Sequence, residues 1–199
     1  VPGTAEQPFV VTDGLFDQTK TESDLGLSKI EGAETVTVFT ATDDTDHYCN
    51  GVVMTEFKGK LYTQWQSSAQ DEDAKDTWVA YSVSDDNGAT WSEPKVLVPT
   101  IDNGYCSSGG WFVSGDTLVS YINVWYSDTT PRGGFAYYVE STDGEHWSEM
   151  KPVLMKDGTP MEGIIEQDPH VLASGRIVNA AHFQPGLFAY PIYTDDPSG

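Results

Sequence analysis

Three histidines and one arginine are the residues of this sequence best suited to acid–base chemistry and to the binding of an anionic group. They are His47, Arg132, His170 and His182, and Arg132 is one of only two arginines in the chain. A free imidazole has a pKa of about 6.5, so it exchanges a proton near neutral pH, whereas a guanidinium keeps its positive charge. A joint role requires a fold that brings these distant positions together.

The elements that must position them recur with a period of 56 to 60 residues. Apolar stretches begin at Gly59, Gly115 and Gly175, and each is followed by a second, aromatic-rich stretch of alternating character. Every unit is interpreted as four short antiparallel strands, which is typical of a β-propeller blade. No stretch has helical periodicity. The sequence therefore predicts an all-β propeller.

Two polar segments follow the aromatic-rich stretches of the first two units. They are "SDDNGATW" from Ser84 and "STDGEHW" from Ser141. Their glycines favour positive φ, and their aspartates can accept hydrogen bonds from the turn's own N–H groups. We expect the tryptophans to pack between neighbouring sheets, so the segments are structural rather than catalytic.

The antiparallel order of the strands predicts that two sets of loops lie at opposite ends of each blade. The segment before strand one, the end of strand two and the loop between strands two and three share one end, and the Asp-containing turns share the other. Equivalent strand-two ends carry Gln66, Asn123 and His182. The predicted binding residues at the first end are Asn50, Gln66, Tyr105, Asn123, Trp125 and Asp168, and core packing is the alternative for the tryptophan.

The segment "VSDDNGATWSEP" resembles the Asp-box, or BNR repeat, of sialidase-like propellers, and the shorter second copy matches that pattern less closely. The stretches "DHYCNGVVMTEFKGKLYTQWQSS", "RGGFAYYVESTDG" and "EQDPHVLASGRIVNAAHFQPG" look most like the uronate-cleaving, ulvan-type polysaccharide lyases. The resemblance implies six or seven four-stranded blades in the complete molecule. Sialidases bind a carboxylate with three arginines. This chain contains only two arginines, which counts against a sialidase site within it.

The resemblance implies a secreted or periplasmic enzyme that cleaves an acidic polysaccharide by β-elimination. Arg132 would neutralise the uronate carboxylate, His47 would remove the C5 proton, and His170, His182 or a tyrosine would protonate the leaving oxygen. One alternative is a sialidase-like exo-glycoside hydrolase with carboxylates such as Glu166 and Asp168. A non-catalytic glycan-binding propeller is the other.

The charge of the chain restricts its partners. Acidic residues outnumber basic ones by 31 to 10, giving a net charge of −21. Such a surface repels nucleic acid and anionic membranes, so neither is an expected partner. No cofactor is expected, and a metal at the three histidines lacks a close-spaced ligand pair. Cys49 and Cys106 are expected to be free thiols.

The repeat units span about 47–100, 104–156 and 164–199, after an N-terminal segment of residues 1–46. Within that segment, Glu34–Asp44 is interpreted as a remnant of an earlier blade or as a ring-closing strand. Three to four blades are fewer than a ring needs. We therefore expect a second polypeptide or a missing segment to complete the propeller; a compact independent domain is the alternative.

Overall fold

The computed structural model describes residues 13–14, 17, 19–20, 27, 30–128, 133–183 and 188–196. The chain divides into two compact units, Val1–Thr35 and Val36–Gly199. The described residues of the first unit contain no strand, and residues 34–44, a candidate remnant or ring-closing strand, are irregular. The second unit carries all of the described sheets.

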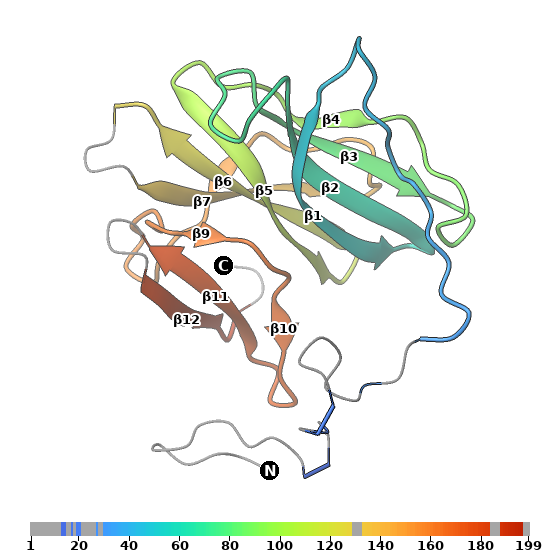
Figure 1. Ribbon diagram of the computed structural model, residues 1–199. Helices are drawn as coiled ribbons and strands as arrows, with labels where there is room; N and C mark the ends of the chain where they lie inside the picture. Colours follow the sequence, from blue (N-terminus) through green and yellow to red (C-terminus); the bar gives the residue numbers. More distant parts are fainter. Residues whose placement is uncertain are drawn as a thin grey trace. The chain divides into compact units, whose positions relative to one another are not determined.

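Three antiparallel sheets make up the second unit (Figure 1). The first contains β1 (Tyr48–Phe57), β2 (Lys60–Ser68), β3 (Trp78–Ser84) and β4 (Lys95–Val98) in sequential order. The second contains β5 (Gly104–Ser114), β6 (Thr117–Tyr126), β7 (Gly134–Ser141) and β8 (Lys151–Pro152) in the same order. The predicted four-stranded antiparallel blades are confirmed.

The third sheet differs in its first strand. Two short strands, β9 (Ile164–Ile165) and β10 (His170–Val171), both pair with β11 (Ile177–Phe183), which pairs in turn with β12 (Phe188–Thr194). Strand one of this blade is therefore present in two pieces. No helix in the described part of the chain has the length and apolar character needed to cross a membrane.

The first strands of the sheets are irregular at equivalent places. The pairing of β1 with β2 shifts between Asn50 and Val53, and that of β5 with β6 shifts between Ser108 and Trp111. Gly110 lies within the second irregularity, where an added Cβ would come 2.3 Å from the Gln167 carbonyl oxygen. Asn50 and Tyr105, which are predicted at the end of the blades where strand one begins, lie inside β1 and β5, because the bulges let pairing continue.

Two apolar clusters join the sheets. The larger one packs the first sheet against the second and includes Tyr62, Tyr81 and Trp111. The smaller one packs the second sheet against the third, around Met161 and Ile165. Both cysteines are free, as expected, and burial raises the pKa of Cys106 to about 12.

The first Asp-containing turn is held by its own polar groups. The Asp86 carboxylate accepts hydrogen bonds from the hydroxyl of Thr90 at 2.6 Å, the amide of Thr90 at 2.8 Å and the hydroxyl of Ser84 at 2.8 Å. These bonds lower the pKa of Asp86 to about 2. Asn87 and Gly88 have φ values of 58° and 88°, so the turn needs residues that tolerate the left-handed region.

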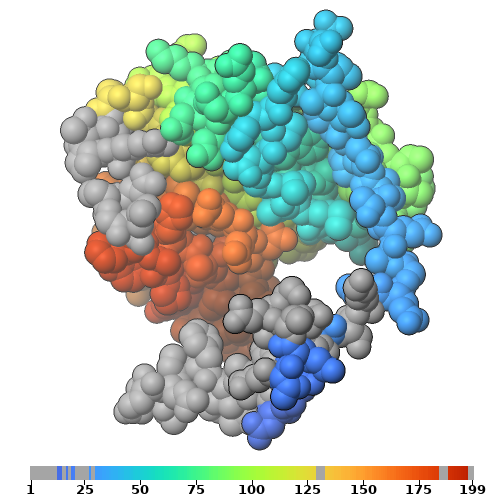
Figure 2. Space-filling model, viewed as in Figure 1, coloured from blue at the N-terminus to red at the C-terminus, as the bar shows by residue number. Residues whose placement is uncertain are grey.

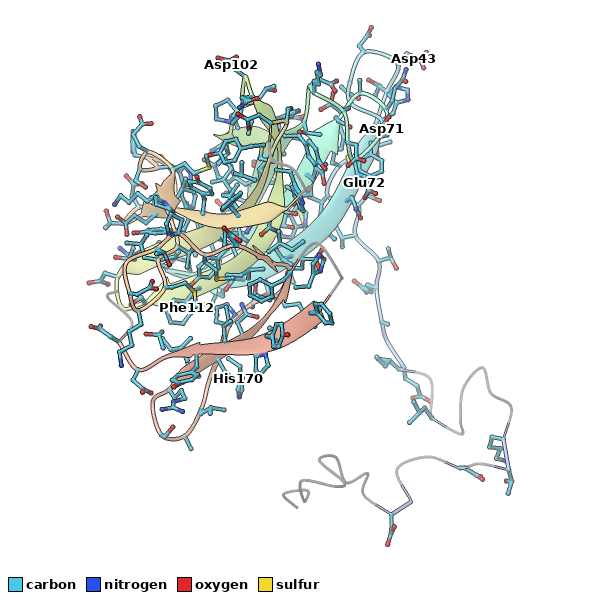
Figure 3. All side chains as sticks on the ribbon, turned by 90° about the vertical axis from the view of Figure 1, so that its left-hand side faces the viewer. Asp43, Asp71, Glu72, Asp102, Phe112 and His170 are labelled. Atoms are coloured by element: carbon cyan, nitrogen blue, oxygen red, sulfur yellow. The ribbon has the colours of Figure 1, made fainter. Side chains whose placement is uncertain are left out.

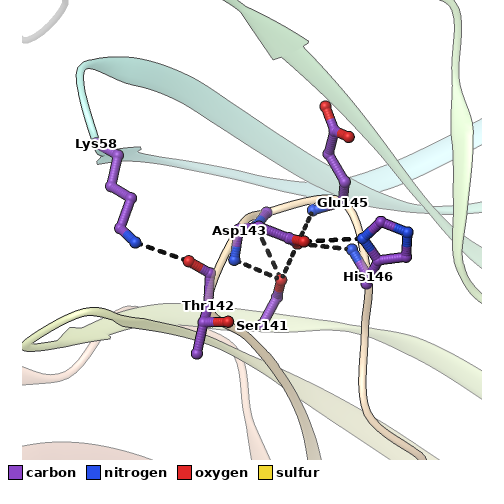
Figure 4. A network of polar contacts seen from close by, with 7 residues as sticks. Lys58, Ser141, Thr142, Asp143, Glu145 and His146 are labelled. Atoms are coloured by element: carbon purple, nitrogen blue, oxygen red, sulfur yellow. Dashed lines mark hydrogen bonds and ion pairs between the residues drawn. The ribbon is translucent and has the colours of Figure 1, made fainter.

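The second turn uses a histidine where the first uses a threonine (Figure 4). Asp143 accepts hydrogen bonds at 2.8 Å from the amides of Glu145 and His146, and the His146 Nδ1 lies 2.8 Å from its other oxygen. The bonds to the His146 and Glu145 amides hold the pKa of Asp143 well below its usual range. Both Asp-boxes are therefore confirmed as structural turns.

The second turn also joins the first two sheets. Trp147 packs edge-on against Tyr81 of β3, with ring centroids 5.6 Å apart, and lies 5.9 Å from Trp111 of β5. Lys58, in the β1–β2 turn, donates a 2.7 Å hydrogen bond to the Thr142 carbonyl oxygen (Figure 4). The Asp-box thus works as a connection between blades, as the sequence predicted for its tryptophan.

Candidate functional site

Strand two of each sheet carries a polar residue at the same structural position near its end. The residues opposite the Asp-box serines Ser84 and Ser141, and opposite Thr194 of the third sheet, are Leu61, Leu118 and Ile177. Five residues beyond each of them stand Gln66, Asn123 and His182. The predicted equivalence of these three side chains is therefore confirmed by strand register.

A pocket of about 230 Å³ lies at this end of the blades. Three sheets supply its walls, and in Figure 2 residues of the first sheet (cyan) and of the third sheet (orange) meet on the face toward the viewer. The first sheet contributes Asn50, Gly51, Gln66, Glu72 and Asp73; the second contributes Tyr105, Ser107, Ser108 and Trp125; the third contributes Ile164, Glu166 and His182.

His182 and Glu166 form the principal titratable pair of the pocket. The Nδ1 of His182 lies 3.1 Å from the Oε2 of Glu166. The other ring nitrogen, Nε2, is buried and has no hydrogen-bond partner among the described residues. A carboxylate beside Nδ1 favours the proton on that nitrogen, which leaves the Nε2 lone pair available. The geometry therefore favours the tautomer of His182 that carries its lone pair on Nε2.

Tyr105 and Trp125 form an aromatic wall. Their rings stack with centroids 5.3 Å apart and planes inclined by 15°, and they face each other across the β5–β6 pair. Gly134 approaches Trp125 so closely that an added Cβ would lie 3.1 Å from its indole nitrogen. The wall is thus fixed on both sides, by a stacked ring and by backbone.

The carboxylates of the lining come from two of the sheets. Glu72 and Asp73 come from the loop between β2 and β3 of the first sheet, and Glu166 comes from the third sheet. The Gln66 amide donates a 2.6 Å hydrogen bond to the Glu72 carbonyl oxygen, and the Tyr48 hydroxyl donates to the Glu72 carboxylate at 3.1 Å. These bonds hold the loop over the pocket. The described lining residues include no lysine or arginine.

Five of the ten predicted site residues line the pocket: Asn50, Gln66, Tyr105, Trp125 and His182. Four of them are predicted from their place at the ends of strands one and two, and Trp125 is predicted to stack on a sugar ring; the structure brings all five together. Their roles in binding or chemistry stay predictions.

Asn123 does not face the pocket, so its assignment as a binding residue is corrected. It is completely buried, and its amide donates to the carbonyl oxygens of Ser108 and Ile165 while its own oxygen accepts from the Ile165 amide at 2.8 Å. The bond to Ser108 lies within the second sheet, and the two bonds to Ile165 join the second sheet to the third. The residue is a tether between blades.

Two more residues lie elsewhere than expected. His170 pairs with Val178, four residues before His182 on β11, which is about 13 Å along a strand. Figure 3 shows it well separated from Glu72 of the pocket. The Oδ1 of Asp168 accepts the Trp111 amide at 2.6 Å, while burial raises the pKa of this carboxyl. The break in strand one explains both positions, because "EQDP" bridges to the second sheet between β9 and β10.

His47 lies just before β1, exposed to solvent, and is not among the residues that line the pocket. Arg132, the predicted cation of the site, lies outside the described residues. The other arginine, Arg176, forms a salt bridge, with bonds of 2.8 and 2.9 Å to Asp195. No group of three or more histidines, cysteines or carboxylates within the described ranges is arranged to hold a metal ion.

Glu72 and Asp73 were missed as site residues, and Glu166 was considered only as a hydrolase carboxylate. The acidic loop "DEDAKD" has the composition of a solvated turn, which hides its part in the pocket. A signal was present nonetheless, because the loop between strands two and three belongs to the set expected at this end. The Ile164–Ile165 pair before Glu166 also indicated a buried strand.

Comparison with known proteins identifies the type of propeller. No curated protein matches the chain. A protein of unknown function from Dyadobacter fermentans DSM 18053 has a TM-score of 0.61 at 13% identity, over 80% of this chain and 54% of that chain. A Trypanosoma rangeli sialidase mutant displaying trans-sialidase activity has a TM-score of 0.56 at 13% identity, over 77% and 29%. T. rangeli sialidase in complex with sialic acid has a TM-score of 0.53 at 15% identity, over 76% and 29%.

These similarities show that the fold is a sialidase-like β-propeller. The chain spans only 29% to 54% of the length of those proteins. The family follows from the sequence itself. A model of the BNR repeat-like domain matches residues 59–199, well over half of the chain and across all three sheets. The chain therefore belongs to the BNR repeat-like domain family.

Proposed function

We propose that the pocket is the reaction centre of a glycan-cleaving enzyme, with His182 as its base. The observation that supports this most is the His182–Glu166 pair, 3.1 Å apart, in a pocket where the buried Nε2 has no partner among the described residues. The Tyr105–Trp125 wall gives the pocket an apolar side against which a sugar ring can pack. The fold analogy with the sialidases agrees with a glycan substrate but does not fix the reaction.

The first candidate reaction is β-elimination at a uronate. The Nε2 of His182 would take the C5 proton, the C4–O bond would break as the C4–C5 double bond forms, and Tyr105 would protonate the leaving oxygen. The charge that builds on the carboxylate needs a cation. Because Glu72, Asp73 and Glu166 make the described lining acidic, Arg132 is the residue assigned to this task.

The second candidate reaction is hydrolysis, which the acidic lining itself favours. A glycoside hydrolase uses two carboxyl groups on opposite sides of the scissile bond, one as acid and one as base or nucleophile. Glu166 of the third sheet and Glu72 or Asp73 of the first approach the pocket from different walls. This arrangement suits a neutral sugar better than a uronate, because no anionic substrate group has to enter among the carboxylates.

The proposal also concerns the parts of the propeller that lie outside this chain and the place where the enzyme acts. Since the similar solved structures are about two to three times as long as the region they share with this chain, we propose that further blades complete the ring around the pocket. We also propose that the enzyme acts outside the cytoplasm, where polymeric glycans are found, and that it needs no cofactor.

The two reactions are separated by their products. Elimination creates an unsaturated uronyl end that absorbs in the ultraviolet, whereas hydrolysis creates reducing ends without that absorbance. The complete protein is incubated with uronate-containing and neutral polysaccharides, and both signals are followed. His182→Ala should lower kcat about 10²- to 10⁴-fold in an elimination, the usual contribution of a general base.

His170→Ala is the matched control, because it removes an imidazole of the same blade that lies outside the pocket. It should leave kcat within about twofold, since surface substitutions have small effects. Full activity of His182→Ala would overturn the assignment of the base. Arg132→Ala should abolish elimination but spare hydrolysis of a neutral glycan, so this variant decides between the two reactions.

A further inference from the structure

A second hollow, of about 310 Å³, lies at the opposite end of the first blade, between the first and second Asp-boxes. The residues of its lining that bear on binding are Lys60, Asp85, Trp91, Lys95 and Glu145. Along β2, Lys60 stands six residues before Gln66, which is about 20 Å at the rise of a strand. The hollow is therefore separate from the pocket that holds His182 and Glu166.

Two lysines line this hollow although the chain as a whole is strongly acidic. Lys60 begins β2 and Lys95 begins β4, and both side chains are exposed. Neither ammonium group has a carboxylate partner within the part of the chain that the structure describes, and the Lys95 Nζ lies 5.9 Å from the centre of the Tyr81 ring. On a chain of net charge −21, such lysines attract an anionic group locally.

An immobilised indole lies beside the lysines. Trp91 is half-buried, and its Nε1 donates a 3.1 Å hydrogen bond to the Gly88 carbonyl oxygen of the same turn. The ring is thus held by the Asp-box, whose own polar groups are satisfied by Ser84 and Thr90. An aromatic surface that is fixed in advance binds a ligand at a low entropic cost.

Two exposed carboxylates complete the hollow. Asp85 precedes the Asp-box aspartate of the first blade, and Glu145 comes from the Asp-box of the second. The amide of Glu145 is held by Asp143, but its side chain projects away from that turn (Figure 4). Carboxylates accept hydrogen bonds from hydroxyl groups. An aromatic face, two cations and two acceptors together match a sugar that carries both hydroxyls and an acidic group.

We propose that this hollow is a second glycan-binding site, selective for sugars that bear carboxylate or sulfate groups. The sugar ring packs on Trp91, its hydroxyls donate to Asp85 and Glu145, and its anionic group accepts from Lys60 and Lys95. The kind of ligand rests on the proposed function, whereas the place rests on the hollow itself. The site would hold a polymer at the end of the propeller remote from the reaction centre.

The test uses hexamers of galacturonate, of a sulfated galactose and of neutral galactose. Binding is followed by calorimetry and by the indole NMR signal of Trp91. The acidic hexamers should bind at least about tenfold more tightly than the neutral one and shift that signal, because two charge-assisted contacts are lost without the anionic group. The carboxylated and sulfated hexamers show which anionic group the site prefers.

Lys60→Gln/Lys95→Gln should weaken binding of the acidic hexamers by about tenfold or more. The control, Lys20→Gln/Lys156→Gln, changes the net charge equally at two exposed lysines that line neither pocket, and should bind as the wild type does. Equal weakening in both double variants would overturn the site, because it would reflect overall charge. So would failure of both acidic hexamers to move the Trp91 signal.

The two proposals fail in different ways. Lys60→Gln/Lys95→Gln should turn over a short substrate like the wild type while its KM for a long polymer rises, because only the polymer reaches both sites. Glycan cleavage without any shift of the Trp91 signal would end the second site alone. A shift of that signal in a protein that cleaves no glycan would end the proposed reaction alone.

Discussion

The two ends of the blades are built from different kinds of interaction. At the Asp-box end, Asp86 and Asp143 bind groups that lie within four residues of them in the sequence. At the pocket end, Asn123 bonds to Ile165, 42 residues away. Glu166, which follows β9, forms an ion pair with His182 of the adjacent strand β11. The two aspartates bond within their own turns, while Lys58 and Trp147 link that end to the neighbouring sheet; at the pocket end the polar bonds themselves join distant parts of the chain.

This difference indicates where variation is tolerated. An Asp-box can exchange one residue for another, as Thr90 and His146 show, because any donor at that position satisfies the second carboxylate oxygen. At the pocket end, Asn123 binds Ile165 through both its amide nitrogen and its oxygen, so a replacement must supply a donor and an acceptor together. Substitutions at the two ends should therefore differ in how much they lower stability and in whether they also change the pocket.

The largest effect is expected for Asn123→Ala. The change removes three hydrogen bonds and leaves buried backbone groups of Ile165 without partners, so it should destabilise the fold by about 3 kcal/mol. Because β9 precedes Glu166, the change should also lower activity at the pocket. Urea unfolding and kcat are the measurements.

Asn123→Asp is the matched variant for that experiment. It keeps the oxygen that accepts the Ile165 amide but replaces the donor that binds two carbonyl oxygens. We expect Asn123→Asp, like Asn123→Ala, to be less stable than the wild type in urea unfolding. Wild-type stability in both variants would contradict the view that tethers between distant residues hold this end.

A smaller effect is expected for Gly144→Ala at the other end. Gly144 has φ of 76°, and an added Cβ would lie 2.1 Å from the Tyr62 hydroxyl of the neighbouring sheet. Either the strain or the displaced tyrosine should cost about 2 kcal/mol, measured by urea unfolding. Gly115→Ala is the control, since its φ is also positive, at 57°, but nothing lies within 4 Å of its added Cβ. Equal losses in the two variants would show that backbone strain alone matters.

The smallest effect is expected from the titration of Asp86. Its pKa is lowered from 3.8 to about 2, chiefly by the Thr90 hydroxyl, so its contribution to stability is present above pH 4 and is lost as the pH falls toward 2. Asp86→Asn should therefore lower the urea midpoint by a few tenths molar at pH 6, and by progressively less below pH 4. A difference between wild type and variant that did not change with pH would contradict this account.

Much of the fold could be predicted because its signals are local or periodic. The 56-residue spacing of Gly59 and Gly115 and the alternation of the strands predict antiparallel blades. Asp-box chemistry depends on side chains that bond their own turn, so Asp86 and Asp143 were assigned correctly. Strand counting also placed Gln66, Asn123 and His182 at equivalent positions.

The sequence by itself determined the strands, the turns and the end of the blades at which Gln66 and His182 lie, because these depend on neighbours along the chain. Only the tertiary structure decided which side chains meet there. Asn123 and His182 are equivalent in sequence, yet one is buried against the next blade while the other lines the pocket beside Glu166. The break in strand one of the third sheet places Glu166 at the pocket and His170 outside it. No local sequence pattern predicts such a break.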